Sequence, residues 1–166
     1  MRNSITITPG PVPGLLGDVA AMHGRYYARE WGFPTYFEAK VAREMGDYLL
    51  RYDPARDLVE SVLEDGRILG SVTMDGSDPD AAPGQGHLRW FILDDSLAGQ
   101  GLGKRLLGDA VGFARNAGFS SIYLTTFRGL EPAGTLYARA GFRVVSELAG
   151  ETWGRAVVEQ RLELDL

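Results

Sequence analysis

A glycine-rich segment in the second half of the chain has the composition of an anion-binding turn. Glycine alternates with other residues across Ala98-Gly99-Gln100-Gly101-Leu102-Gly103-Lys104, between an apolar run that ends at Leu93 and an amphipathic run that starts at Leu102. This pattern predicts a strand, a tight turn and the N-terminus of a helix. A helix N-terminus offers unpaired N–H groups and the positive end of the helix dipole, and glycine lets an anion approach the backbone. The segment therefore predicts a site for a phosphate-bearing ligand at residues 99–104.

Composition limits the other kinds of chemistry. The 166 residues carry a formal net charge of −5, which argues against a nucleic-acid binder. The absence of cysteine excludes disulfides, thiolate metal sites and a cysteine nucleophile, and only two histidines argue against a histidine-rich metal site. The N-terminal residues lack a long apolar run and no segment is apolar enough for a membrane span. We expect a cytoplasmic protein without a metal.

The first half of the chain predicts a strand, two helices and a hairpin. Thr35 is a candidate N-cap for the second helix, with Glu38 as its capping-box partner. Asp65-Gly66 is a typical two-residue hairpin turn. The expected elements are a strand over 4–8, a helix from 15 to about 31, a helix from 35 to about 50, and strands over 57–64 and 67–74.

The second half of the chain predicts four more strands of the same sheet and two more helices. A Gly-, Asp- and Pro-rich loop over 75–86 leads to a strand over 87–93, whose apolar content predicts burial on both faces. There follow a helix from Leu102 that ends near Gly118, a strand over 121–126, a helix from 131 to 140, and strands over 142–148 and 152–164 joined by Ala149-Gly150. The order β-α-α-β-β-β-α-β-α-β-β predicts an α/β fold with a mixed sheet between helices, in a single domain over 1–166.

Four segments together resemble the GNAT superfamily of acyl-CoA-dependent N-acyltransferases: Leu88–Asp94, Gly99–Gly103, Leu124–Thr126 and Leu136–Phe142. The resemblance covers essentially the whole chain, and the expected element order fits a GNAT-like, three-layer fold with a central mixed sheet. The segment His23-Gly24-x-Tyr26-Tyr27-x-x-Glu30 and the pair Trp153-Gly154 are similar to acetyltransferase domains fused behind MarR-type regulators. We expect a free-standing version of such a domain.

The resemblance implies acetyl-CoA as the donor, with its pyrophosphate on the glycine-rich turn. Ala98 stands where the family has Arg or Gln, and Leu130 where it often has Asn, so the donor contacts are expected to be mainly through the backbone. The donor-binding residues implied in this way are Ile92, Leu93, Ala98, Gly99, Gln100, Gly101, Leu102, Gly103, Lys104 and Arg139.

Acetyl transfer from a thioester to an amine needs a neutral amine, a stabilised tetrahedral oxyanion and protonation of the departing thiolate. The resemblance makes Tyr137 the candidate general acid, although its spacing alone also fits a core aromatic. It places the oxyanion donor at a backbone N–H near Leu93. Glu30 is the first candidate for general base, with an ordinary surface carboxylate as the alternative reading. His23, Asp75 and Glu131 are the other candidates.

The acceptor site is expected beside the first helices and the central strand, at Tyr26, Arg89, Trp90 and Thr125. Arg89 lies in an apolar strand, where a cation is costly unless it is paired. It can clamp an acceptor carboxylate, pair with an internal acid, or face outward at an edge. The acceptor is expected to be a small-molecule amine. A protein amine, a non-catalytic acyl-CoA sensor and a homodimer through the last hairpin stay open.

Overall fold

The protein is described here by a computed structural model that covers residues 4–166, in which seven strands form one sheet. The strand order is β1-β2-β3-β4-β5-β7-β6, and the predicted element order is confirmed. The strands are β1 (Ile5–Pro9), β2 (Leu58–Glu64), β3 (Arg67–Asp75), β4 (Gln85–Leu93), β5 (Ser121–Phe127), β6 (Arg143–Gly150) and β7 (Val157–Asp165). The helices are α1 (Leu15–Trp31), α2 (Thr35–Leu50), α3 (Leu102–Asn116) and α4 (Ala133–Ala140), with a 3₁₀ turn over Asp95–Leu97.

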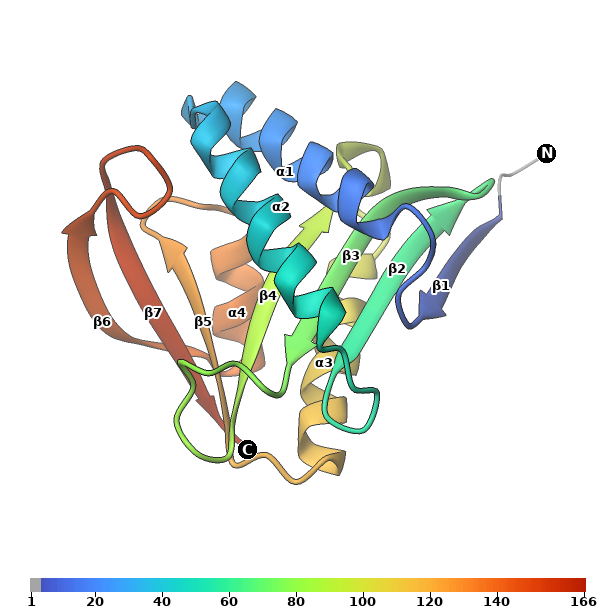
Figure 1. Cartoon of the computed structure of the whole chain (residues 1–166). Helices are drawn as coiled ribbons and strands as arrows, with labels where there is room; N and C mark the ends of the chain where they lie inside the picture. The colour runs from blue at the N-terminus through green and yellow to red at the C-terminus, as the bar shows by residue number, and fades with distance from the viewer. Residues whose placement is uncertain (1–3) are drawn as a thin grey trace.

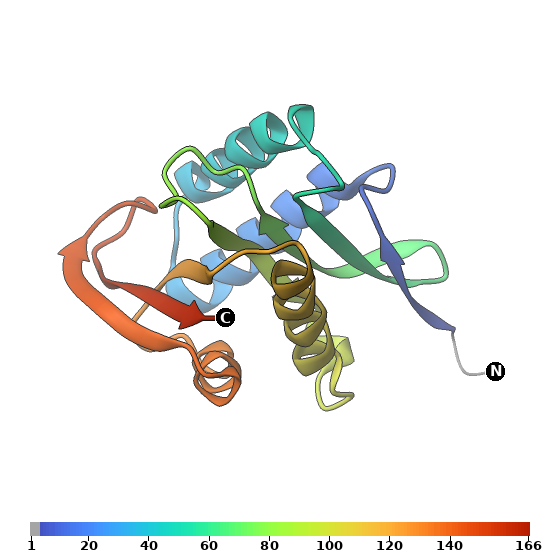
Figure 2. The same ribbon diagram turned by 90° about the horizontal axis from the view of Figure 1, so that it is seen from below.

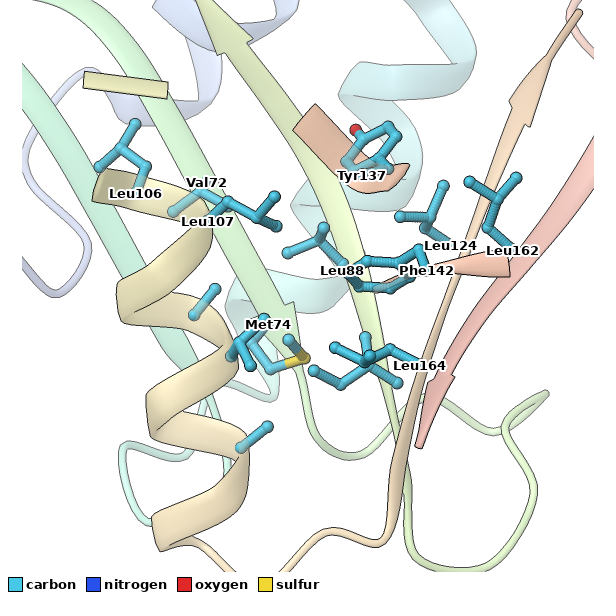
Figure 3. Close-up of a cluster of buried hydrophobic side chains, with 14 of the residues drawn as sticks. Val72, Met74, Leu88, Leu106, Leu107, Leu124, Tyr137, Phe142, Leu162 and Leu164 are labelled. Atoms are coloured by element: carbon cyan, nitrogen blue, oxygen red, sulfur yellow. The ribbon is translucent and has the colours of Figure 1, made fainter. Parts of the chain in front are cut away.

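The helices cover the sheet from both sides, as the predicted three-layer arrangement requires. Helices α1 and α2 pack on one face and α3 and α4 on the other (Figures 1 and 2). Between the sheet and α3 and α4 lies the largest core cluster, which includes Val72, Met74, Leu88 and Phe142 (Figure 3). On α3, Leu106, Ala110 and Ala114 are completely buried at a spacing of four residues, which is the helical period read from the sequence.

The central strand β4 is less buried than the sequence predicted, since it is not covered on both faces along its whole length. Beyond Leu88 its side chains are only half-buried, because β4 pairs with β5 solely over Gln85–His87 against Ser121–Tyr123. This is the sheet's one parallel pairing among residues 4–166, and the two strands diverge after it (Figure 1). We call the space between the diverging ends the fork. The second half of β4 is therefore only partly covered, and apolar content alone did not reveal this.

A β-bulge bends β4 at the start of the fork. Val72 of β3 faces two residues of β4, because the register moves from Thr73 opposite Arg89 to Ser71 opposite Ile92. Trp90 lies within the bulge with a φ of +47°, in the left-handed region that side chains other than glycine rarely adopt. A bulge increases local twist and bends its strand, so this one helps to turn β4 away from β5.

Two local predictions were wrong. Thr35 is the first residue of α2 rather than its N-cap, and the predicted capping box is absent; the first turn instead closes through the N–H of Phe37 on the carbonyl of Pro34, at 2.9 Å. The last hairpin turns over residues 151–156, not at Ala149-Gly150, because Gly150 still pairs with Val157. The Asp65-Gly66 turn is confirmed, with φ of +50° and +78°.

Truncation of the α3 core stripe should destabilise the fold. Leu106 has no exposed surface, so Leu106→Ala removes packing and leaves a cavity, with an expected cost of about 2–5 kcal/mol. Leu50 is 90% exposed, and Leu50→Ala is the matched control, with an expected change within about 0.5 kcal/mol. Urea unfolding of both variants measures the difference, and equal stability of the two would contradict the assigned core.

Candidate active site

The fork contains a cavity of about 140 Å³ that reaches from the α1–α2 layer to α4. Aromatic side chains from five parts of the chain form one wall: Tyr27, Phe33, Phe37, Phe127 and Trp153. Their rings meet at centroid distances between 4.9 and 6.1 Å, mostly edge to face or tilted, which is the preferred geometry of aromatic packing. A cavity of about 150 Å³ holds benzene in other proteins, so this one has room for a small organic group.

Tyr137 reaches the cavity from α4. Its ring packs on Phe91 and Phe142 at centroid distances of 6.2 and 5.8 Å, and the side chain is 7% exposed. Its hydroxyl group points away from the core cluster below it (Figure 3). Burial raises the pKa of Tyr137, so the phenol keeps its proton at neutral pH. The residue is thus both a core aromatic and a buried proton donor at the cavity.

The other end of the cavity is charged. Arg89 donates to Glu44 of α2 at 3.1 Å and to Asp75 at 3.3 Å, and its guanidinium stacks on the Trp90 ring at 4.1 Å. Lys40 forms an ion pair with the same Glu44, one helical turn away. Asp75 is completely buried and accepts two hydrogen bonds from Arg51, at 2.8 and 2.6 Å. We call these five side chains the charged cluster; within it Arg89 has the internal acids that a buried arginine requires.

His23 lies on the aromatic wall in a defined tautomer. Its Nδ1 is 2.8 Å from the carbonyl oxygen of Val19, and since a carbonyl only accepts, Nδ1 carries the proton and Nε2 has the lone pair. The side chain is 5% exposed, and burial lowers the pKa of His23 to about 4 despite that hydrogen bond. His23 is therefore neutral at physiological pH, with a free basic nitrogen in a residue that lines the cavity.

His87 stands at the closed end of the fork beside the charged cluster. Its Nδ1 lies 2.6 Å from Asp78, which also accepts from the Tyr123 hydroxyl at 2.5 Å, and the His87 and Tyr123 rings stack at 4.1 Å. Burial alone would raise the pKa of Asp78, but these two bonds hold it below its usual range. Burial lowers the pKa of His87, so the His87 ring contributes little positive charge.

The glycine-rich turn lies beyond the open end of β4. Gly99 and Gly101 have φ of +76° and +75°, and a side chain at either position would project into open space. Gly101 is the N-cap of α3 and no side chain caps the helix, so its first N–H groups remain free for an anion. Gly103 differs, because a Cβ there would lie 3.1 Å from Leu136 and 3.5 Å from Leu93. It allows α3 to pack closely against α4 and β4.

A second cavity, of about 120 Å³, lies between α1 and the end of β4. It is lined by Tyr26 together with the predicted donor residues Ile92 and Leu93. Arg29 of α1 crosses to Asp95 at 2.9 Å and fixes α1 to the loop that leads to the glycine-rich turn. Tyr26 thus lies near the predicted donor-binding residues and does not line the fork cavity.

The structure brings some predicted site residues together and separates others. Tyr137, Arg89, Trp90 and Thr125 share the fork cavity. Arg139 is exposed on α4 and lines neither cavity.

The predicted bases also lie apart. Glu30 is exposed, binds Arg29 at 2.9 Å and lines neither cavity, so its position gives no support to its predicted role as base. Glu131 is exposed and accepts a hydrogen bond from Thr135. Asp75 is enclosed by two arginines. Only His23 among the candidate bases lies on the cavity wall.

Sequence reasoning missed the α2 side of the cavity. Lys40 and Glu44 flank the apolar stripe of α2 and face the fork with Phe37. Their one signal was a pair of opposite charges at a spacing of four, which is also common on solvent-exposed helix faces. His87 was missed because its partner Asp78 lies in an irregular loop.

The sequence model described as "Acetyltransferase (GNAT) family" matches residues 20–142. Solved structures with the same fold include the ribosomal-protein-alanine N-acetyltransferase from Brucella melitensis (TM-score 0.75, 15% identity, covering 97% of this chain and 99% of that one). They also include yncA from Salmonella typhimurium with its cofactor acetyl-CoA (TM-score 0.68, 19% identity, covering 99% of this chain and 95% of that one). A third is the IAA acetyltransferase from Bacillus cereus ATCC 14579 (TM-score 0.64, 20% identity, covering 98% of this chain and 100% of that one). No curated protein sequence matches the chain significantly.

The part of the chain that the structure describes has neither a metal-binding cluster nor a membrane-spanning helix. Across residues 4–166, no group of three or more His, Asp or Glu side chains is arranged to hold a metal ion. None of the helices in that range has the length and apolar character needed to cross a membrane.

The neutral state of His23 predicts a pH dependence of stability. The unfolded chain protonates His23 below its ordinary pKa of 6.5, whereas the folded protein does so only near pH 4. The free energy of unfolding should therefore fall by about 2–3 kcal/mol as pH drops from 7.5 to 4.5, over and above the contributions of other groups.

The variant His23→Asn isolates this effect, because Asn keeps a donor for the Val19 carbonyl and cannot titrate. Urea unfolding of both proteins at the two pH values measures the difference between their pH slopes. His87 is present in both proteins, so its contribution cancels. Parallel slopes would contradict the lowered pKa, because they would mean that His23 has the same pKa in the folded and the unfolded chain.

Proposed function

Because the chain belongs to the GNAT acetyltransferase family and is an acyltransferase that uses acetyl-CoA, we propose that it acetylates a primary amine of a small molecule. The observation that supports this most directly is the cavity in the fork, which Tyr137 and the aromatic wall line together. Its volume of about 140 Å³ suits a small organic acceptor. The structural neighbours are named for different acceptors and do not decide this point.

The residues present fit acetyl-CoA along two parts of its length. The uncapped N-terminus of α3, with open space at Gly99 and Gly101, suits the pyrophosphate. Beyond His87, the backbone of β4 has no pairing with β5, so its polar groups on that side can pair with an extended ligand. Lys104 extends from the first turn of α3 and is exposed, where it can meet the phosphates. Ala98 is exposed and adds no charge, so the backbone carries the site.

The chemistry divides between the two sides of the cavity. Acetyl-CoA supplies the acetyl group as a reactive thioester. Tyr137 holds a proton at neutral pH and can donate it to the departing sulfur. A backbone N–H near Leu93 can donate to the carbonyl oxygen. We assign the role of base to His23 in place of Glu30. When the amine nitrogen bonds to the acetyl carbon, that nitrogen becomes strongly acidic, and the free Nε2 of His23 can take its proton.

Three broader proposals accompany this function. Residues 1–166 form a single acetyltransferase domain. Within the family, the chain groups with the domains fused to MarR-type regulators, on the residues of the His23–Glu30 segment and Trp153-Gly154. We also propose that it acts in the cytoplasm.

Reversing a charge at the N-terminus of α3 should weaken donor binding. Lys104→Glu places a carboxylate beside the proposed phosphate site, and we expect at least a tenfold (~1.4 kcal/mol) increase in the Kd for acetyl-CoA. Arg115→Glu makes the same change of charge in the last turn of the same helix and is the control, with an expected change below about twofold. Isothermal titration measures both. Equal effects of the two variants would exclude the turn as the phosphate site.

Turnover tests the function and the role of Tyr137 together. Purified protein and acetyl-CoA are incubated with small amines, lysine peptides and peptides with a free N-terminus, and release of the free thiol is followed. We expect the protein to turn over small amines. The variant Tyr137→Phe should be about 10²-fold slower, while its affinity for acetyl-CoA should stay within about threefold of that of the unaltered protein. Tyr36→Phe, at an exposed tyrosine, should change neither. Turnover on peptides alone would point to a protein acceptor, and tight binding without any turnover to a sensor.

A further inference from the structure

The fork cavity has two ends of different chemistry, and this difference restricts the acceptor. Aromatic rings of α1, the α1–α2 connection, α2 and β5 form the apolar end. The charged cluster forms the other end, through Lys40, Glu44 and Arg89. A ligand that fills the cavity must therefore have an apolar body and a polar or charged group. The rest of this inference depends on the proposed N-acetyltransferase function of the same cavity.

The ion pairs of the charged cluster are not balanced. Lys40, Arg51 and Arg89 contribute three cations, whereas Glu44 and Asp75 contribute two carboxylates. Asp57 and Asp78 also lie near Arg51, but Asp57 accepts from the backbone N–H groups of Asp53 and Gly76, and Asp78 is hydrogen-bonded to His87 and Tyr123. Each cation contacts a carboxylate, but Lys40 and Arg89 share Glu44, and these two side chains are only 17% and 15% exposed. A half-buried excess cation favours an anionic ligand.

Glu44 marks the position that such an anion can occupy. Its carboxylate bridges Lys40 and Arg89, and it is the most exposed of the three side chains, at 33%. Arg89 forms an ion pair with the fully buried Asp75 and stacks on the Trp90 ring, and these two contacts fix the orientation of its guanidinium. Its bonds to Glu44 and Asp75 leave further N–H groups for the carboxylate of a ligand. A cationic acceptor such as a polyamine would instead meet the two cations.

We propose that the acceptor amine carries a carboxylate that binds between Lys40 and Arg89, beside or in place of the Glu44 carboxylate, with an apolar or aromatic body against the aromatic wall. The acceptor class is therefore an amino acid or a related amino acid derivative with a non-polar side chain. Lys40 and Arg89 determine specificity for the carboxylate and take no part in proton transfer. Attack by the amine on the acetyl group, with release of the thiol, is the reaction already proposed.

A matched pair of acceptors tests this: phenylalanine and phenylalaninamide, with leucine and leucinamide as the aliphatic pair. The amides have less basic amines, so more of each amide is neutral at pH 8, and a preference for the acids cannot arise from amine ionisation. We expect kcat/KM to be at least tenfold higher for the acids, in line with a charge-assisted hydrogen bond. Equal rates, or faster turnover of the amides, would overturn the proposal.

The variant Lys40→Gln should lower the acid-to-amide ratio of kcat/KM at least fivefold. Arg43→Gln removes one positive charge from the exposed face of the same helix and should leave the ratio unchanged. We choose Lys40 because substitution of Arg89 would leave Asp75 buried with fewer partners and could unfold the protein. The same ratio in both variants would overturn the proposal.

Ligand binding separates this proposal from the proposed function. N-acetylphenylalanine and N-acetylphenylalaninamide are titrated into the protein, and binding is followed through tryptophan fluorescence, since Trp90 and Trp153 line the cavity. Tighter binding of the acid, lost in Lys40→Gln, would support the carboxylate site even if no amine in the panel is acetylated. Turnover of amines with no preference for the acid in either assay would leave the acetyltransferase function intact and exclude the carboxylate site.

Discussion

The short parallel pairing of β4 with β5 is the constraint on which the site depends. Three residues of each strand are paired, after which β5 continues against β7 for its whole length while β4 bends at Trp90. Two strands of one sheet that separate in this way leave polar backbone groups and half-buried side chains on the inner edges of the fork. The cavity exists because those edges are separated, and a ligand rather than a strand can satisfy them. A longer pairing would give a better sheet and no site.

The charged cluster has a structural role as well as the chemical one argued above. Glu44 belongs to α2 and Arg51 follows its last residue, whereas Asp75 and Arg89 belong to β3 and β4, so their ion pairs join the C-terminal half of the helix to the sheet. Removing one partner of such a buried network leaves an uncompensated charge, which costs far more than the loss of an exposed pair. The position of the charged end of the cavity is therefore fixed by the same bonds that stabilise α2.

The fold could be predicted from the sequence because its patterns are local. The stripe on α3, the Asp65-Gly66 turn and the Gly118 terminus each report a preference of a few neighbouring residues, and the structure agrees with each. The failures required non-local information. Residue Pro34, not Thr35, caps α2, and the last turn lies at 151–156 because β6 and β7 pair as far as Gly150 and Val157. The half-burial of β4 depends on where β5 leaves it, which no window of sequence contains.

Site residues that act through their own backbone conformation could be predicted from the sequence, whereas those that depend on contacts between distant segments could not. The turn at Gly99 and Gly101 could be found because positive φ has a local signature, whereas Gly103 serves packing against Leu136, a contact between distant segments. Lys40 and Glu44 could not be distinguished from a solvent-exposed pair, because only the fold places α2 over the fork. Glu30 has the residue type of a base, but it lies about two helical turns from His23 along α1, where it pairs with Arg29, is exposed to solvent and lines neither cavity. Which face of a helix meets the cavity is decided by the packing of α1 and α2 on the sheet, so acceptor recognition is the part of this protein's function that sequence patterns describe least.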